Sequence, residues 1–276
     1  MEIKILSALW GYEDQPLEQI LDRIAEAGYQ GVDTFLPDDL TAQKHLLQAL
    51  RSRNLSLVAH QHQAAGENFE AFKRSYLRYL EWSAEGEPLL INSHTGKDYF
   101  SFSQNLELTD IAQSFSDRTG IVVAHETHRS RFLYGPAASA PYFEARPGLG
   151  ITADLSHWVC VSESFLEGFP EVLSEAIRRT QHIHARIGYE EGPQVPDPRA
   201  PEWAYAVEPF LRWWDQILQN RFARGEKITT ITAEFGPVPY MHTIPFTAKP
   251  VVDLFEVNQY MLELLGARYA HYGDAS

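Results

Sequence analysis

The sequence lacks several features that would assign it to common classes of protein. It has a single cysteine among 276 residues, Cys160, which excludes an intrachain disulfide. No basic cluster is longer than RSR at 51–53, and the formal net charge is −14, so a nucleic-acid-binding surface is not expected. No apolar stretch approaches the ~18 residues of a membrane span, and the opening residues lack the pattern of a secretory signal. We therefore expect a soluble, cytoplasmic protein without a nucleic-acid or membrane partner.

Glycine-rich motifs for nucleotides are also missing. No GxGxxG follows the first apolar run, and no GxxxxGK[ST] occurs anywhere in the chain. Such motifs bring backbone N–H groups close to phosphates, and without them nucleotide binding loses its usual support. The sequence therefore predicts no dinucleotide cofactor.

Eight short apolar runs alternate with helical patterns along the whole chain. This alternation predicts an α/β protein with a parallel sheet, and eight units favour a closed (β/α)8 TIM barrel over an open sheet. The length is somewhat above the roughly 250 residues typical of such a barrel, so we expect one domain over residues 1–276. The expected strands are 3–9, 31–35, 55–60, 89–94, 121–126, 149–154, 181–187 and 229–235.

Four of these runs reach a side chain that can bind a metal ion. Glu126 follows IVVAH, Asp154 follows LGITA, His184 lies in QHIHA and Glu234 follows TTITA. The carboxyl ends of parallel strands meet at one end of a barrel, where ligands usually bind. Because side chains alternate between the two faces of a strand, each of the four shares a face with small or polar residues before it. They are therefore expected to point inward together.

Three converging carboxylates would repel one another without a cation between them. One divalent metal ion, bound by Glu126, Asp154, His184 and Glu234, removes this repulsion. Oxygen ligands suit Mg²⁺ and Mn²⁺, and the imidazole also suits Co²⁺ and Zn²⁺. We favour Mn²⁺ among these four ions.

Histidines recur at the same strand ends. His125 should point away from the face of Glu126, toward the helices, and is expected to be structural. The others near strand ends are candidates for substrate contacts or for support of the metal ligands, and Trp10 follows the first strand at the same end of the barrel. The expected substrate-binding residues are Trp10, His60, His62, His94, His128, His157 and Arg186.

Two long segments, 187–202 and 236–250, are rich in proline and glycine and follow strands that carry expected ligands. Long ordered loops of this kind are commonly lids or binding loops. We expect them to choose the substrate. Aromatic residues on them, such as Trp203 and Tyr240, could serve a lid or the interface of a homo-oligomer.

Taken together, these motifs resemble those of the xylose isomerase-like barrels, a superfamily of sugar isomerases and epimerases, inosose dehydratases and endonuclease IV. The sugar epimerases carry a Glu ending strand five, D-x-x-H ending strand six, H-x-H on strand seven and a Glu ending strand eight. The resemblance implies that Glu126, Asp154, His184 and Glu234 bind the metal. It also implies that Glu126 and Glu234 are the acid/base pair, and that His157 and Arg186 contact substrate oxygens. The matching residues here are Glu126, Asp154-Leu-Ser-His157, His182-Ile-His184 and Glu234.

These residue types suit a sugar isomerase or epimerase. A metal held by two adjacent substrate oxygens stabilises an enediolate, while carboxylates remove and return the proton of a small sugar or polyol-derived ketone. The chain departs from xylose isomerases, which carry a Lys where His128 stands and use a hydride shift, so proton transfer is favoured. Strand seven also departs, because HARIG places Arg186 and Ile187 where many relatives have Lys and Asp.

Three alternatives remain open from the sequence. A dehydratase of the inosose or dehydroshikimate type would begin with the same proton abstraction. An endonuclease IV-like enzyme would use His60 or His62 with His94 as extra zinc ligands, but its Asp-x-His is matched only by Asp197-Pro-Arg199. A non-catalytic barrel would bind the metal and a small ligand without reaction.

Overall fold

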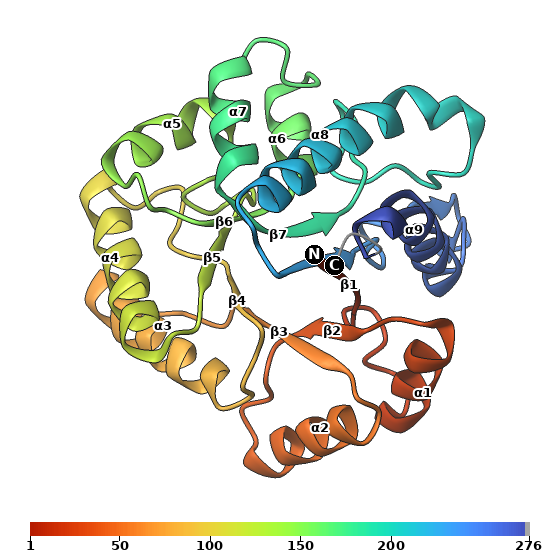
Figure 1. Cartoon of the computed structure of the whole chain (residues 1–276), viewed down its shortest axis with the longest axis horizontal. Coiled ribbons are helices and arrows are strands. Elements are labelled where there is room, and N and C mark those ends of the chain that lie inside the picture. The colour runs from red at the N-terminus through yellow and green to blue at the C-terminus, as the bar shows by residue number, and fades with distance from the viewer. Residues whose placement is uncertain (274–276) are drawn as a thin grey trace.

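Eight parallel strands close into a barrel in the computed structural model, which describes residues 1–273 (Figure 1). Each strand pairs with the next one in the chain, and the last pairs with the first, with Glu2 opposite Ile228. All eight strands predicted from the sequence are present, and their ends lie within two residues of the prediction. The strands are β1 (Glu2–Ala8), β2 (Gly31–Thr34), β3 (Ser56–Gln61), β4 (Ile91–Ser93), β5 (Val123–Glu126), β6 (Ile151–Ala153), β7 (Thr180–Ala185) and β8 (Ile228–Ala233).

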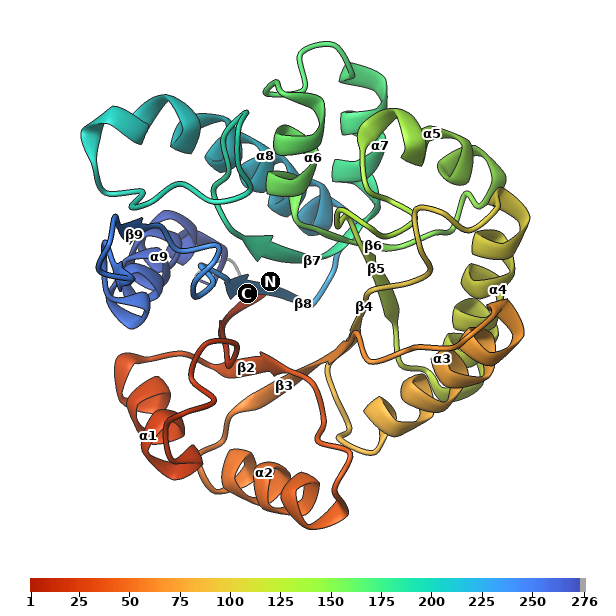
Figure 2. The ribbon, with the colours of Figure 1, turned by 180° about the vertical axis from the view of Figure 1, so that it is seen from behind.

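Helices surround the barrel on all sides, as the view from behind also shows (Figure 2). One helix, α6, is additional to the outer ring and begins directly after β6. The predicted loop 236–250 contains a short hairpin that the sequence did not predict, formed by β9 (Thr243–Ile244) and β10 (Lys249–Pro250). The helices are α1 (Leu17–Ala27), α2 (Leu40–Ser52), α3 (Phe69–Ala84), α4 (Phe102–Thr119), α5 (Pro136–Ala145), α6 (Leu155–Ser162), α7 (Pro170–Arg179), α8 (Ala204–Ala223) and α9 (Leu254–Tyr269), with short 3₁₀ turns η1 (Pro201–Trp203) and η2 (Ala270–Tyr272).

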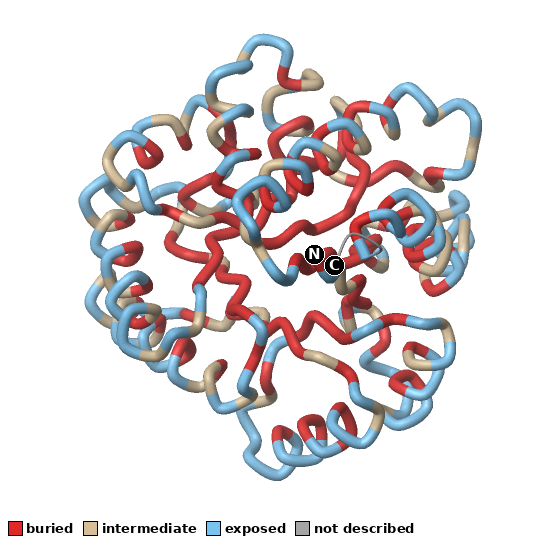
Figure 3. The backbone as a smooth tube through the Cα atoms, in the orientation of Figure 1, coloured by how far each residue is buried: buried red, intermediate tan, exposed pale blue. Residues whose placement is uncertain are grey.

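The buried residues form two hydrophobic clusters. The larger one lies between the strands and the helices, and the strands are buried while the outer faces of the helices are exposed (Figure 3). The smaller one consists of Leu6, Val58, Leu90 and Ala124, which come from four different segments of the barrel wall. Alternation along a strand places residues two positions apart on the same face. Ala124 is therefore followed on its own face by Glu126, and an apolar layer lies beneath the polar residues of the site.

The first residue of the chain lies beside one of the last residues that the structure describes. The amino group of Met1 donates a hydrogen bond to the carbonyl oxygen of Tyr272 at 3.2 Å. Among residues 1–273, no helix combines the length and the apolar character needed to cross a membrane.

Candidate functional site

Three of the four predicted metal ligands lie together at the carboxyl end of the barrel. Glu126 ends β5, Asp154 follows β6 directly, and His184 lies near the end of β7. Each offers a ligand atom, and these atoms all lie within 4.8 Å of one another. All three residues are buried, so a cation between them would be shielded from bulk water.

Glu234, which directly follows β8, lies close to this group and contacts His184. Its Oε2 lies 2.8 Å from Nδ1 of His184, and Oε1 of Glu126 lies 3.6 Å from that nitrogen. Both His184 Nδ1 and Glu234 Oε2 are buried, and the hydrogen-bond geometry between them is poor, so neither is well satisfied. Buried polar atoms without a partner are costly. A cation between these nitrogen and oxygen donors would satisfy both of them.

Asp154 is already engaged by neighbouring side chains. It is the N-cap of α6, where one oxygen accepts hydrogen bonds from the backbone N–H and the hydroxyl of Ser156. The other oxygen accepts from the guanidinium of Arg186, which also lies 3.5 Å from Glu234. Burial raises the pKa of Asp154 to about 6, although Arg186 acts in the opposite direction. Arg186 therefore connects two of the predicted metal ligands to each other.

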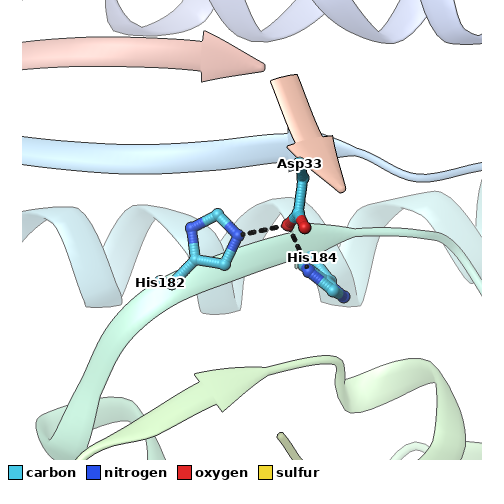
Figure 4. A group of neighbouring side chains, drawn as sticks. All are labelled: Asp33, His182 and His184. Carbon is cyan, nitrogen blue, oxygen red and sulfur yellow. Dashed lines mark hydrogen bonds and ion pairs between the residues drawn. The ribbon is translucent and has the colours of Figure 1, made fainter. Parts of the chain in front are cut away.

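The sequence interpretation missed Asp33, which lies on β2 inside the barrel. Its Oδ2 receives hydrogen bonds from Nε2 of His184 at 2.9 Å and from Nε2 of His182 at 3.2 Å (Figure 4). The hydroxyl of Thr232 on β8 donates to the same oxygen at 3.0 Å. The sequence did contain a signal for Asp33, because it is a charged residue within the apolar strand GVDTF. Its side chain lies on the face opposite Val32.

This arrangement decides which nitrogen of His184 can bind a metal. With its Nε2–H directed to the carboxylate of Asp33, Nδ1 faces Glu126 and Glu234 and becomes the metal-binding nitrogen when a cation displaces its proton. Metal-binding histidines commonly donate their second N–H to a carboxylate in this way. Burial alone would raise the pKa of Asp33, but the hydrogen bonds from His182 and His184 hold it below its ordinary value. Asp33 is therefore ionised and can accept both hydrogen bonds.

The charges at the centre of the site stabilise one another. Burial opposes ionisation of Glu126, yet the neighbouring His94 and His184 hold its pKa well below its ordinary value. Burial likewise opposes protonation of His184, yet the carboxylates of Glu234 and Glu126 raise its pKa well above its ordinary value. The negative potential that attracts a proton to His184 would also attract a divalent cation.

A second group of possible ligands adjoins the first through Glu126. Its Oε2 lies 3.0 Å from Nε2 of His94, within hydrogen-bond distance, and 3.7 Å from Nε2 of His60, which is buried without a hydrogen-bond partner. Asn92 on β4 donates to the same carboxylate oxygen at 2.7 Å. The sequence interpretation did not include Asn92, whose amide holds Glu126 in place.

His128 and His157 lie next to each other, with ring centroids 4.0 Å apart. Burial lowers the pKa of His128 to about 4, and burial also lowers the pKa of His157 well below its ordinary value. Nε2 of His157 lies 3.1 Å from the guanidinium of Arg186. Both imidazoles are therefore neutral near pH 7.

A cavity of about 540 Å³ opens onto this group of residues. It is lined by most of the residues expected to contact substrate, but His157 is not among them, because it is fully buried behind its neighbours. Glu126 and Glu234 line the cavity, whereas Asp154 and His184 lie behind its wall. The expected residues that do line it are Trp10, His60, His62, His94, His128 and Arg186.

Trp10 is fixed against the end of β8. A Cβ atom at Gly236 would lie 2.2 Å from the Trp10 ring, so the ring packs directly on a backbone without a side chain. The edge of the ring also meets Tyr240, with centroids 5.1 Å apart. Tyr240 is the one residue of the predicted loops 187–202 and 236–250 that lines the cavity, so the barrel strands and the first loops supply most of its wall.

His125 lies outside the site, as its position in the strand predicted. Its Nδ1 lies 2.6 Å from the hydroxyl of Thr95, and its ring packs edge-on against Phe132. Asp197 and Arg199, the partial match to an endonuclease motif, pair with each other at 2.8 Å.

The donor set suits a divalent metal ion. Carboxylate oxygens from Glu126, Asp154 and Glu234, together with Nδ1 of His184, form a mixed oxygen and nitrogen set that Mn²⁺, Co²⁺, Zn²⁺ and Mg²⁺ accept to different degrees. The two poorly satisfied buried atoms at its centre, His184 Nδ1 and Glu234 Oε2, fit a cation as their shared partner.

The sequence matches no model of a protein family and no curated protein. Solved structures nevertheless resemble the whole chain. 3-Keto-D-glucoside 4-epimerase, YcjR, from E. coli is 13% identical with a TM-score of 0.64, and the match covers 96% of this chain and 100% of that one. The probable 3-DHS dehydratase AsbF from Bacillus anthracis is 14% identical with a TM-score of 0.59, covering 96% and 98%. Endonuclease IV from Thermus thermophilus is 13% identical with a TM-score of 0.58, covering 96% and 98%.

These three structures differ in activity but share one architecture with this chain. At such low identity the likeness concerns the fold, and it agrees with the closed barrel of eight parallel strands. The fold predicted from the sequence, a closed (β/α)8 TIM barrel, is thereby confirmed.

Proposed function

We propose that the protein is a divalent-metal-dependent sugar isomerase or epimerase that moves a proton on a small carbohydrate or polyol-derived ketone. The placement of Glu126 and Glu234 around one nitrogen of His184 supports this function. Their carboxylates approach Nδ1 from β5 and β8, at 3.6 Å and 2.8 Å, and both residues line the cavity. Two carboxylates at one substrate position can remove a proton and return it.

Glu126 suits the role of the base. Its low pKa keeps it ionised at neutral pH, and Asn92 and His94 hold one of its oxygens in place. Glu234 reaches the same point from the other strand and suits the role of the acid that returns the proton. When bound, a divalent cation at Glu126, Asp154, His184 and Glu234 supplies an electrophile that stabilises the negative charge developing on the substrate oxygens.

Arg186 and His128 would bind substrate oxygens. Both line the cavity, and Arg186 extends into it from the end of β7 while it remains paired with Asp154. His157 would support these two residues rather than contact the substrate, because it is buried in the cavity wall and contacts both Arg186 and His128. We favour Mn²⁺ as the ion, since it accepts both carboxylate and imidazole ligands.

Proton transfer can be tested by incubating unphosphorylated ketoses, aldoses and inososes with the protein and Mn²⁺ in D₂O, followed by NMR. We expect deuterium at the carbon next to the carbonyl. Glu234→Gln should reduce its uptake at least about a hundredfold, because a general acid or base contributes 10²–10⁴-fold. Glu202→Gln, on the exposed turn η1, is the matched control and should leave uptake unchanged. Absence of exchange in every compound would overturn the proposal, and a new alkene signal would identify a dehydratase instead.

The metal site can be tested separately by calorimetric titration with Mn²⁺. Glu126→Ala and Asp154→Ala should each weaken binding more than about tenfold, since even supporting residues of metal sites have effects of 10–100-fold. If both variants bind Mn²⁺ as tightly as the parent, the assigned ligands are wrong.

An endonuclease IV-like activity is the second candidate, because His60, His94 and Glu126 form an adjoining group of possible ligands. The net charge of −14 disfavours binding to a phosphate backbone. Nicking of a duplex with an abasic site, abolished by His94→Ala, would favour this candidate over the isomerase.

A further inference from the structure

The cavity has two chemically different halves. The half at the barrel mouth is polar and contains the carboxylates and histidines described above. The other half extends toward α1 and α2 and is lined mainly by hydrocarbon and aromatic side chains. We call this half the apolar arm, and it consists of Trp10, Leu17, Ile20, Phe35, Ala42 and Leu46.

The aromatic rings of Trp10 and Phe35 lie where the polar half and the apolar arm meet. Trp10 and Phe35 are 38% and 40% exposed as residues, which is high for large apolar groups. Their orientations are set by protein contacts, because Trp10 packs on Gly236 and Tyr240, and Phe35 meets His62 edge-on with centroids 5.1 Å apart. These rings offer a ready apolar surface beside the polar site, and a bound apolar group would cover it.

The apolar arm lies between two helices, which an ion pair also connects. Leu17 and Ile20 belong to α1, and Ala42 and Leu46 belong to α2. His45 on α2, which also lines the cavity, has its Nε2 2.9 Å from a carboxylate oxygen of Glu18 on α1.

The charges of the cavity wall disfavour an anionic ligand. Asp33, Glu126 and Glu234 line the polar half, and Glu13 lines the side toward α1. Arg186 is the one Lys or Arg in the lining, and it is already paired with Asp154 and close to Glu234. With a cation offsetting the carboxylates of the polar half, a phosphate or carboxylate in the apolar arm would still meet Glu13 and find no Lys or Arg beside it in the lining.

From these features we infer that the substrate is amphiphilic: a neutral sugar or polyol ketone that carries an uncharged hydrocarbon or aromatic substituent, which the apolar arm binds. The substrate class rests on the proposed function, since the polar half must hold the reacting sugar. The volume of about 540 Å³ agrees, because it falls within the 300–1,000 Å³ of pockets that hold drug-sized ligands and exceeds what a bare monosaccharide needs.

The apolar arm can be tested with n-alkyl β-D-glucosides, which have no carbonyl and cannot react. Affinities of the methyl, butyl and hexyl glucosides for the Mn²⁺-loaded protein would be measured by isothermal titration calorimetry. We expect a gain of about two- to fourfold per methylene, the upper figure corresponding to full burial of the group. Affinity that does not depend on chain length, or absence of hexyl glucoside binding, would overturn the inference.

A charged side chain placed in the apolar arm provides the second measurement. Ala42 is exposed and lies in the first turn of α2, where an acidic residue suits the helix dipole, so Ala42→Glu should fold normally. It should weaken hexyl glucoside binding at least about tenfold and leave methyl glucoside binding unchanged. Thr41→Glu adds the same charge one residue away, outside the lining, and should change neither affinity.

These results are separable from those on the proposed function. A protein that prefers long alkyl chains but exchanges no deuterium would keep the apolar arm and lose the isomerase activity. A protein that exchanges deuterium but binds all the alkyl glucosides equally would support the isomerase activity and contradict the apolar arm. Equal effects of Ala42→Glu and Thr41→Glu on hexyl glucoside binding would also contradict the inference.

Discussion

Single residues determine how His184 can act as a ligand. Nδ1 of His184 faces the carboxylates of Glu126 and Glu234. Its Nε2, on the other side of the ring, faces the carboxylate of Asp33. Because Asp33 accepts the N–H at Nε2, Nδ1 is the nitrogen that would bind a cation, which would displace the proton it shares with Glu234. Asp33, which is not one of the proposed ligands, would thus position one of them.

Asp33→Asn should weaken Mn²⁺ binding about 10- to 100-fold, the usual effect of removing a carboxylate that orients a metal ligand. The amide keeps the size of the side chain but offers His184 a weaker, uncharged acceptor. Calorimetry would measure the affinity, and ¹⁵N NMR of the imidazole would report the loss of the Nε2–H form of His184. Asp14→Asn, at an exposed position, is the control. Unchanged affinity and tautomer would contradict the positioning role.

His125 should make the stability of the protein depend on pH. Burial lowers its pKa in the folded state to about 3, whereas the unfolded chain has a value of about 6.5. Between these values the unfolded state binds the extra proton, so the free energy of unfolding is highest above pH 6.5 and falls as the pH falls. His125→Phe should reduce that loss by on the order of 2 kcal/mol between pH 6.5 and 4.5.

Urea unfolding at both pH values would measure the two losses. Because other buried histidines add to the pH dependence, the informative quantity is the difference between parent and variant. Equal losses in both proteins would show that His125 is not held neutral by burial.

At the scale of secondary-structure elements, the strands carry the residues of the candidate site, and the helices pack around the strands. Side-chain alternation places Ala124 and Glu126 on one face of β5, so the apolar layer and the ligand above it come from the same short strand. Asp154 combines two positions, because it caps α6 and lies among the proposed metal ligands. This double use explains why α6 begins immediately after β6.

Helix capping can be tested on α3, far from the proposed ligands. The side chain of Asn68 accepts a hydrogen bond from the backbone N–H of Ala71 at 3.0 Å. Asn68→Ala leaves that donor without its partner and should lower the free energy of unfolding by about 1 kcal/mol. Glu67→Ala, at the exposed preceding position, should have little effect in the same urea titration. Equal effects of the two substitutions would argue against the cap.

At the scale of the whole molecule, closure of the barrel brings distant parts of the chain into one site. Asp33 and His184 are 151 residues apart in the chain and yet share a hydrogen bond of 2.9 Å. Pairing of β1 with β8 completes the ring and brings β2 opposite β7 and β8 in the interior. The site therefore forms only when the whole barrel has formed.

Metal binding should consequently stabilise the entire fold. A ligand that binds only the folded state, at about 100 times its Kd, adds about 2.7 kcal/mol to the free energy of unfolding. For a chain of this size we expect Mn²⁺ to raise Tm by roughly 5 °C, measured by calorimetry against the same protein in EDTA. Glu126→Gln should remove the increase, and an equal increase in that variant would place the ion elsewhere.

Much of the fold and part of the site follow from sequence patterns that depend on near neighbours. Alternating apolar runs and helical stretches predicted all eight strands, and the residues ending four of them predicted Glu126, Asp154, His184 and Glu234 as a group. Such patterns arise because strand and helix periodicity are local properties of the chain. Asp33 and Asn92 were missed because their importance lies in the partners they meet across the barrel.

The sequence by itself therefore determined the alternation of elements, the closed barrel and the ring of polar side chains at one end of it. Only the tertiary structure decided that Arg186 engages Asp154, that Asp33 orients His184, that His157 lies behind the cavity wall, and that an apolar arm opens between α1 and α2. The physical reason is that periodicity is set by neighbouring residues, whereas hydrogen bonds and cavities depend on how distant segments pack in space.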